Sequence, residues 1–351
     1  MSTEEHMSPG DTRTVTAGSV VIRVDSSPPA LKAAGRRILV TVLTLSILMN
    51  LMFVMRSAAD ASGATGQVSE THHSGTRSAD AKLAVINFSG TIMPPFTERW
   101  LKQIERATED PDVKGVLLAV DSPGGLVADS HQIYHELQKL REKKPIYVAM
   151  KRLAASGGYY LSMGIGTQGR IFVEPTTWTG SIGVIIPRYN ASELASRIGV
   201  AVEPLATGPM KDSLNPFREL SDQEREVWDL VLQDSFDRFV GVIVDNRAGL
   251  DEQQVRALAT GQIYTASQAI TNGLADEVGF EEDALEALAT AAGVTDYEVV
   301  EYSSPPTLMD LLLSGKAESS DSVLAQLMDA TVPRAMYYCS WNPWVPTSPQ
   351  R

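Results

Sequence analysis

Residues 146–160 read IYVAMKRLAASGGYY, an apolar run that leads into a stretch of small residues. The run Ile146–Met150 has the length and composition of a buried strand. The stretch Ala154–Tyr160 follows it and is expected to begin a helix. Small neighbours leave the hydroxyl group of Ser156 uncrowded, and the free N–H groups at a helix start favour negative charge nearby. Ser156 is therefore a candidate nucleophile, with an ordinary helix-capping serine as the alternative.

Apolar runs of the same type lie upstream, at Leu83–Phe88 and Val116–Val120. Between the runs, apolar residues recur at helical spacing, as at Ile133 and Leu137. Alternation of strands and helices predicts an α/β domain in which helices cover a sheet. We place this domain at residues 82–303.

Two further helix starts are marked by their capping residues. Ser221 and Glu224 form a capping-box pattern, which predicts a long amphipathic helix that runs to about Arg247. Thr265 predicts the start of a short helix that stops at Asn272-Gly273.

The run Ile38–Met55 is an uncharged stretch of 18 residues. At about 1.5 Å per residue a helix of this length spans roughly 27 Å, close to the thickness of a hydrocarbon core. We predict one transmembrane helix here, with a cleaved signal peptide or a buried core helix as alternatives. Residues 1–37 are polar and are predicted to be a mostly disordered tail, and residues 57–81 a flexible tether.

Basic residues lie mainly on the N-terminal side of this run. The basic residues within twenty positions before the run are Arg23, Lys32, Arg36 and Arg37, whereas Arg56 is the only basic residue that closely follows it. The positive-inside rule then leaves the N-terminus in the cytoplasm and exports the rest of the chain. We therefore expect a single-pass protein of the cell (inner) membrane whose catalytic domain is extracytoplasmic.

The composition excludes several classes of function. The formal net charge of the chain is -13, which argues against a nucleic-acid partner because such a partner requires a basic surface. Cys339 is the only cysteine, so a disulfide framework and a cysteine-based zinc site are both excluded.

A second loop of small residues follows Val116–Val120 and reads Asp121-Ser122-Pro123-Gly124-Gly125. Paired glycines after a strand let backbone N–H groups point into a cleft, because no side chain stands in the way. Such groups can stabilise a developing oxyanion. The N–H of Gly157, next to Ser156, is the second candidate donor. On this motif alone, an ordinary turn is the alternative.

The histidines are badly placed to act as a base for Ser156. His6 lies in the N-terminal tail, and His72 and His73 lie in the predicted tether. His131 and His135 are four residues apart, as metal ligands on one helix face are, but the segment lacks the glutamate of a metalloprotease helix. We therefore expect a solvated helix face there.

A lysine is the remaining candidate base. It must be neutral to accept a proton, so its pKa has to fall several units below about 10.4 through desolvation. Lys211 lies in an apolar loop shaped by glycine and proline, at residues 207–212. Since most lysines are surface residues, a solvated lysine is the alternative.

Several motifs together resemble those of the single-domain signal peptide peptidases. Ala154–Tyr160, then Thr179–Val184, then Gly208–Asp212 occur in the order and approximate spacing of that family, and Asp121–Gly125 and Gly261–Thr265 match further family segments. The similarity covers roughly residues 82–299. It does not extend to the N-terminal tail, the tether or the last fifty residues.

The resemblance implies a serine endopeptidase with a serine–lysine dyad. In it Ser156 is the nucleophile, Lys211 the general base and later the general acid, and Ser181 the hydroxyl that orients the lysine ammonium group. The implied oxyanion hole consists of Gly157 with one of Gly124 and Gly125. No metal and no cofactor are required.

The resemblance also implies a fold and an assembly. The fold is the Clp-protease/crotonase type, a spiral of β-β-α units, and the protomers form a homo-oligomeric ring in which neighbouring subunits complete each active site. The implied substrates are signal-peptide remnants or other membrane-derived peptides. The alternatives are a non-catalytic membrane scaffold with the same fold and a crotonase-type acyl-CoA enzyme.

The C-terminal extension, residues 304–351, lies outside the resemblance. Its segment Met336–Trp344 reads MYYCSWNPW and concentrates aromatic residues. An apolar strip of this kind usually marks an interface. The membrane, a neighbouring subunit and the peptide cleft are the three possible docking surfaces, and we favour contact with protein.

Overall fold

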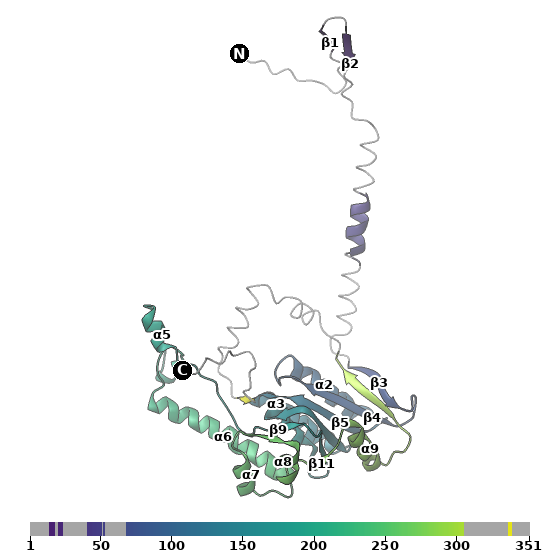
Figure 1. Ribbon diagram of the computed structural model, residues 1–351, viewed down its shortest axis with the longest axis vertical. Helices are drawn as coiled ribbons and strands as arrows, with labels where there is room; N and C mark the ends of the chain where they lie inside the picture. Colours follow the sequence, from purple (N-terminus) through teal and green to yellow (C-terminus); the bar gives the residue numbers. More distant parts are fainter. Residues whose placement is uncertain are drawn as a thin grey trace. The chain divides into compact units, whose positions relative to one another are not determined.

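The computed structural model describes residues 14–17, 20–23, 41–50, 52, 68–304 and 336–338 (Figure 1). The chain divides into two units, Met1–Thr65 and Gly66–Arg351. In the tail predicted to be mostly disordered, β1 (Thr14–Ala17) and β2 (Val20–Arg23) pair as an antiparallel hairpin. Both strands are rich in β-branched residues, which favour extended backbone.

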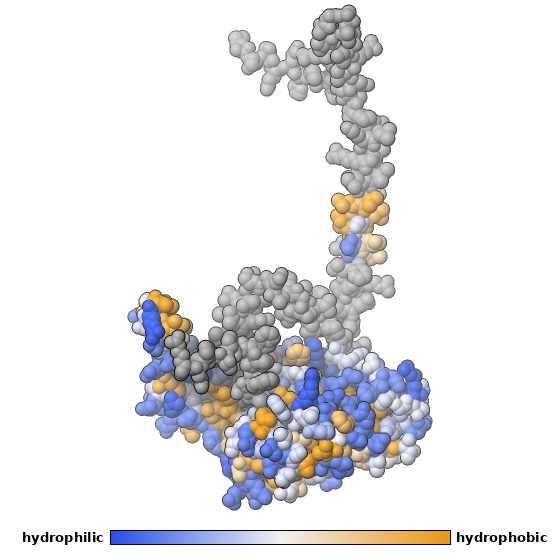
Figure 2. Space-filling view, in the orientation of Figure 1, coloured by the Kyte–Doolittle hydropathy of each residue, from blue (hydrophilic) through white to orange (hydrophobic). Residues whose placement is uncertain are grey.

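Residues 41–50 are helical, within the stretch predicted to cross the membrane. The side chains of this helix are mainly apolar and exposed (Figure 2), among them Leu43, Ile47 and Leu48. No helix within the described ranges is both long and apolar enough to cross a membrane.

Nine strands of the described chain form one sheet in the second unit. Their order is β10-β9-β7-β5-β4-β12-β3, with β8 beside β7 and β11 beside β8. The strands of this sheet are β3 (Ser69–Gly75), β4 (Lys82–Ser89), β5 (Val113–Ser122), β7 (Ile146–Ala155), β8 (Ile171–Val173), β9 (Trp178–Gly180), β10 (Ile263–Thr265), β11 (Glu277–Val278) and β12 (Glu298–Ser303). The central pairs β12–β4, β4–β5 and β5–β7 are parallel.

Helices cover both faces of this sheet, which confirms the predicted α/β class (Figure 1). The helices are α2 (Phe96–Glu109), α3 (Val127–Arg141), α4 (Gly157–Ser162), η1 (Met163–Ile165), α5 (Ser192–Arg197), η2 (Pro209–Asp212), α6 (Asp222–Asn246), α7 (Glu252–Leu258), α8 (Ala266–Thr271) and α9 (Glu281–Ala292). Successive residues of a strand face opposite sides. Accordingly, Leu83 and Val85 pack in a smaller cluster with α9, whereas Ala84 and Ile86 belong to the larger core with α2 and α3.

The capping signals mark the helices that they predict. The Ser221 side chain and Glu224 form a reciprocal capping box at the start of α6, which ends at Asn246. The Thr265 side chain accepts a hydrogen bond from the Gln268 N–H and caps α8, whose C-cap is Asn272.

The tether predicted for residues 57–81 is too long. Its second half contains β3, which pairs antiparallel with β12 at the edge of the sheet. β3 has no apolar alternation and is mostly exposed, so its sequence gives no strand signal. It forms because an edge strand offers unpaired backbone groups to any extended neighbour.

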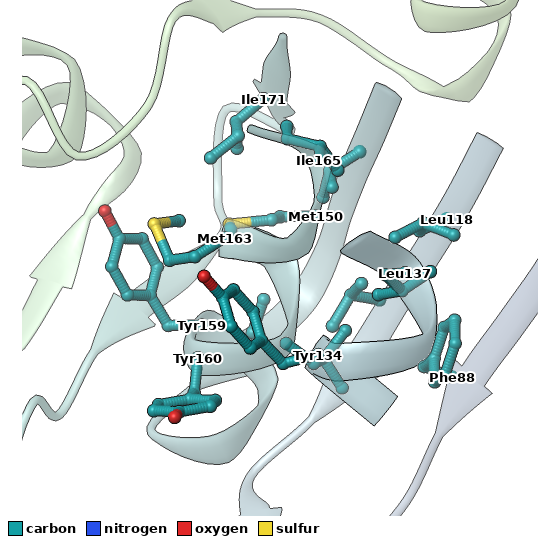
Figure 3. Close-up of a cluster of buried hydrophobic side chains, with 14 of the residues drawn as sticks. Phe88, Leu118, Tyr134, Leu137, Met150, Tyr159, Tyr160, Met163, Ile165 and Ile171 are labelled. Atoms are coloured by element: carbon teal, nitrogen blue, oxygen red, sulfur yellow. The ribbon is translucent and has the colours of Figure 1, made fainter. Parts of the chain in front are cut away.

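α4, the helix that follows Ser156, is buried along its whole length. Figure 3 shows Tyr160 near Tyr134 of α3, and Tyr159, Met163 and Leu137 belong to the same buried cluster. The Tyr134 and Tyr160 rings meet edge to face with their centroids 5.5 Å apart. The Tyr159 hydroxyl donates to the Leu274 carbonyl at 2.9 Å. This packing holds the start of α4, and therefore Ser156, in one position.

Candidate active site

Ser156 lies at the sharp junction between β7 and α4. Its backbone has φ 55° and ψ -114°, a left-handed conformation that costs a non-glycine residue on the order of 1–3 kcal/mol. Two backbone hydrogen bonds hold it there: the Ser156 N–H donates to the Gly180 carbonyl at 2.7 Å, and its own carbonyl accepts from the Tyr160 N–H at 2.8 Å. Strain of this kind persists only where the surrounding structure holds it in place, and it clusters at functional sites.

The hydroxyl group of Ser156 is buried and unpaired. The residue is 1% exposed, and its Oγ has no hydrogen-bond partner in the described part of the chain. An unsatisfied buried hydroxyl costs roughly 1–3 kcal/mol. Among the described residues, the site thus contains a buried hydroxyl group whose hydrogen-bonding capacity is unused.

The two glycine loops meet beside Ser156. A β-carbon at Gly157 would lie 3.1 Å from the Gly125 nitrogen, 3.2 Å from the Gly124 Cα and 2.6 Å from the Ser130 Oγ. Only a glycine at position 157 permits this close approach. The structure therefore brings together the three glycines that the sequence singles out.

The N–H of Gly124 is already engaged, because it donates to the Ser122 Oγ at 3.1 Å. Gly124 begins the short strand β6 (Gly124–Leu126), one side of which is bonded to Ile92. The Ile92 N–H donates to the Gly124 carbonyl at 2.9 Å, and the Leu126 N–H donates to the Ile92 carbonyl at 2.8 Å. Backbone groups alternate in direction along a strand. The N–H and carbonyl of Gly125 therefore face away from Ile92.

Ser122 and Ile92 are contributors that the sequence interpretation missed. Ser122 lies within the quoted Asp121–Gly125 motif and is fully buried, so a serine before two glycines is a usable signal. Ile92 lies in an isolated bridge opposite Gly125 and has no local signal.

Ser181 lies directly after Gly180, whose carbonyl accepts the Ser156 N–H. Its φ is 51°, a second left-handed non-glycine backbone, and it is 8% exposed. The Ser181 N–H donates to the Gln262 carbonyl at 2.7 Å, which fixes the turn after β9. The structure thus places Ser181 close in the backbone to the candidate nucleophile.

Lys211 is not brought to this site by contacts within the described chain. It lies in η2 and is exposed, and the Ser156 Oγ accepts no hydrogen bond from it. The loop around it is nevertheless ordered by Arg218, which binds Asp212 at 2.9 Å and also Glu224 at the start of α6. The Arg218 guanidinium, together with hydrogen bonds from Ser221, lowers the pKa of Glu224 to about 2.

The region that carries Lys211, called here the outer segment (residues 185–231), exposes many apolar side chains. In α6 the buried apolar residues all lie from Phe239 onward, and α5 buries only Ala195. Figure 1 shows α5 lying away from the sheet. The exposed large apolar residues of the outer segment are Ile185, Tyr189, Leu194, Ile198, Val200, Val202, Leu205, Phe217, Val227, Leu230 and Val231. So extensive an apolar surface indicates an interaction site.

The prediction of a solvated histidine face is wrong for His131. Its Nδ1 lies 2.7 Å from the Tyr160 hydroxyl, and its ring stacks on Tyr134. Burial lowers the pKa of His131, which favours the neutral ring. Within residues 68–304 and the shorter described ranges, no group of three or more His, Cys, Asp or Glu side chains is arranged to hold a metal.

Comparison with known proteins identifies the family. The Peptidase family S49 model matches residues 138–295, which include Ser156, Ser181 and Lys211, and the Clp protease model matches residues 71–195. The chain is 39% identical over 254 residues to a candidate signal peptide peptidase SppA of Enterococcus faecium, over 69% of this chain and 73% of that one.

Two further matches lie at greater distance. Protease 4 of Salmonella typhi is 32% identical over 259 residues, which are 72% of this chain and 41% of that protein. A solved structure of a ClpP1 mutant from Listeria monocytogenes matches with a TM-score of 0.40 and 16% identity, over 57% of this chain and 94% of that one.

The predicted fold is confirmed at the level of an α/β sheet of Clp-protease type, since the Clp protease model covers the strands that carry the glycine loops. A buried serine stands beside those loops, where backbone N–H groups can serve a serine nucleophile. The chain belongs to peptidase family S49 and is a serine endopeptidase.

Proposed function

We propose that Ser156 and Lys211 form a catalytic dyad that hydrolyses signal-peptide remnants and other membrane-derived peptides. The observation that carries this proposal is the Ser156 hydroxyl, which is buried, has no partner among the described residues and is held at a strained turn beside two glycine loops. A buried hydroxyl left without a partner is costly unless a group from outside bonds to it.

The chemistry follows from the two side chains. The Ser156 Oγ attacks the scissile carbonyl carbon while its proton passes to the neutral Lys211 amine. The resulting ammonium group then gives that proton to the leaving amine as the peptide C–N bond breaks. Water hydrolyses the Ser156 ester by the same steps, with Lys211 again accepting and returning a proton. In this proposal Ser181 orients the Lys211 amine.

The oxyanion donors in this proposal are the N–H groups of Gly125 and Gly157. The N–H of Gly124 is occupied by Ser122, whereas that of Gly125 faces away from Ile92 and lies close to Gly157. Preorganised donors of this kind contribute roughly 2.7–4 kcal/mol each to the transition state in well-studied enzymes. Ser122 is then a positioning residue for the loop.

Ser122→Ala should lower kcat about tenfold and leave KM nearly unchanged, because the loop loses the hydrogen bond that orients Gly124 and, through it, Gly125. Steady-state peptide hydrolysis provides the measurement. Ser162→Ala is the matched control, since Ser162 is also fully buried but bonds only to the Gly158 carbonyl within α4. Equal kcat values for the Ser122→Ala and Ser162→Ala proteins would show that Ser122 does not position the glycine loop.

Assembly would complete the dyad. Lys211 is exposed in the described chain, whereas the proposed mechanism requires its amine to be shielded from water. Burial against a second copy favours its neutral form. The apolar side chains of the outer segment support such a contact, because they would be covered in a homo-oligomeric ring. The proposed ring thus gives one surface two roles, in assembly and in catalysis.

The proposed membrane anchor is the run Ile38–Met55, whose described helical part exposes apolar side chains. The flanking charges favour a cytoplasmic N-terminus. A reporter fused before Arg36 should therefore behave as cytoplasmic, and one fused after Ala81 as exported. Protease digestion of intact cells that removes the N-terminus would contradict this topology.

A fluorophosphonate probe tests the proposed nucleophile. We expect the probe to label the full chain at Ser156 and to block hydrolysis of a membrane-derived peptide in proportion to labelling. Mass spectrometry locates the modified residue. An acyl-CoA enzyme or a non-catalytic scaffold of the same fold would give no label at Ser156, and that result would refute the proposed function.

A further inference from the structure

The loop that carries Lys211 is not held in place by apolar packing. Of residues 201–223, all of which the structure describes, only Ser213 is buried. The four residues of η2, Lys211 among them, are all at least partly exposed. Ser213 itself is bound to α6 by a polar contact, because the Trp228 indole N–H donates to the Ser213 Oγ at 3.0 Å. Hydrogen bonds and ion pairs therefore determine where this loop lies.

The Arg218 guanidinium joins the loop to the start of α6. Its Nε donates to the Asp212 carboxylate at 2.9 Å, and its Nη2 donates to the Asp212 carbonyl at 2.6 Å. Its two terminal nitrogens also donate to the two carboxylate oxygens of Glu224, at 2.9 and 2.5 Å. A fifth bond, at 3.0 Å, goes to the Glu219 carbonyl. A guanidinium group has five N–H donors, and these five bonds match that number.

Both ends of this connection are fixed in turn. The Glu224 carboxylate accepts from the Ser221 N–H at 2.9 Å and from the Ser221 hydroxyl at 2.8 Å, which holds it in the first turn of α6. At the other end, the Asn215 amide donates to both carboxylate oxygens of Asp212 at 3.1 Å. Bidentate bonds between charged groups fix orientation as well as distance. Since Asp212 directly follows Lys211, the backbone beside Lys211 is fixed as well.

We infer that Arg218 is a positioning residue for Lys211, acting through the clamp that it forms with Asp212 and Glu224. The inference rests on the proposed function in the role that it gives to Lys211. A general base must come within about 2.6–3.2 Å of the proton donor. A misplacement of about 1 Å can lower a rate about 100-fold. The clamp supplies the precision that this exposed loop does not obtain from burial.

The test compares Arg218→Lys and Arg218→Gln in the full chain. Lysine keeps the positive charge, but its single ammonium group cannot reproduce the planar, bidentate geometry of a guanidinium. Glutamine removes the charge as well. Arg256→Lys is the matched control, since Arg256 also binds two carboxylates, those of Asp237 at 2.7 Å and Glu252 at 2.8 Å. The Arg256 side chain is 39% exposed and that of Arg218 35%, so the two sites are similarly solvated.

We expect kcat for peptide hydrolysis to fall about 10- to 100-fold in both Arg218 variants, with KM nearly unchanged. The Arg256→Lys protein should match the parent. Hydrogen exchange of the amides of residues 210–215, followed by mass spectrometry, should be faster only in the Arg218 variants. Parental kcat in either Arg218 protein, a lowered kcat without faster exchange, or an equal loss in the Arg256→Lys protein would each overturn the inference. The Arg218→Lys protein alone decides the test if Arg218→Gln fails to fold.

The pH profile distinguishes positioning from a purely electrostatic role. In the Arg218→Lys protein the rate should fall by the same factor at every pH, because the charge near the loop is kept and only the geometry changes. A profile that moves along the pH axis instead would mean that Arg218 acts through its charge, and would reject the positioning role.

The inference and the proposed function can fail separately. The Lys211→Ala protein is measured beside the Arg218 variants. An active Lys211→Ala protein would refute the proposed dyad whatever the Arg218 variants do. An inactive Lys211→Ala protein together with parental kcat in the Arg218→Lys protein would retain the dyad and reject only the positioning role.

Discussion

Ser156→Ala is expected to abolish peptide hydrolysis while the domain stays folded and becomes no less stable. The loss in kcat should be at least about 10⁴-fold, because the covalent route is closed and only binding and the oxyanion hole remain. Within the part of the chain that the structure describes, the Oγ of Ser156 is buried without a partner, so its removal should raise the free energy of unfolding by up to about 1 kcal/mol. Peptide hydrolysis and thermal unfolding in the same detergent provide the two measurements.

Ser162→Ala serves as the control for this stability effect. Ser162 is as buried as Ser156, but its hydroxyl donates to the Gly158 carbonyl at 2.7 Å. Its replacement should cost about 0.5–1.5 kcal/mol and leave hydrolysis intact. A Ser156→Ala protein that unfolds at a clearly lower temperature would contradict an unpaired hydroxyl in the folded protein. A Ser156→Ala protein that retains more than a trace of activity would contradict the role of Ser156 as nucleophile.

Lys211→Ala should cause a loss of activity comparable to that of Ser156→Ala. Lys211→Arg should fail as well, because a guanidinium group does not give up its proton at any accessible pH. In the parent enzyme the rate should rise with pH as the Lys211 amine becomes neutral, since only that form accepts the Ser156 proton. A rate that stays flat from about pH 6 to 10, with chemistry limiting, would exclude lysine as the base.

Mixing the two inactive proteins distinguishes a dyad shared between subunits from one within a chain. If Lys211 of one copy serves Ser156 of its neighbour, random co-assembly of equal amounts of the two variants restores about one quarter of the sites. An intact site needs a Lys211→Ala chain, which supplies Ser156, next to a Ser156→Ala chain, which supplies Lys211. Each of the two positions holds the required chain in about half of the cases. Mixed oligomers are prepared by co-expression and compared with each variant alone. No recovery in proven mixed oligomers would place both residues of the dyad within one chain.

Much of the fold could be predicted because its signals are local. The apolar runs before Ser122 and Ser156 form the central parallel strands β5 and β7, which are buried on both faces and are therefore continuously apolar. The capping boxes at Ser221 and Thr265 mark helix starts because a cap bonds to residues three positions away.

The candidate site was predictable in part. Ser156 and the glycines stand out because their chemistry requires particular residue types at short spacing, and the fold brings them together through parallel strands that end at one edge. Which of Gly124 and Gly125 donates in the proposed oxyanion hole was not predictable. It depends on the hydrogen bond from Gly124 to Ser122 and on the bridge to Ile92, which is about thirty residues away in the chain.

The strand and helix pattern, the small-residue surroundings of Ser156 and the similarity to family S49 peptidases can all be read from the amino-acid sequence. Four features become visible only in three dimensions: β3 joins the sheet, the Ser156 hydroxyl has no partner among the described residues, Lys211 is exposed, and the strand Met336–Tyr338 lies along β6. The physical reason is the range of the interactions. Caps and apolar periodicity act within a few residues, whereas edge pairing and burial depend on segments that are far apart in the chain and carry no local signal of their partner.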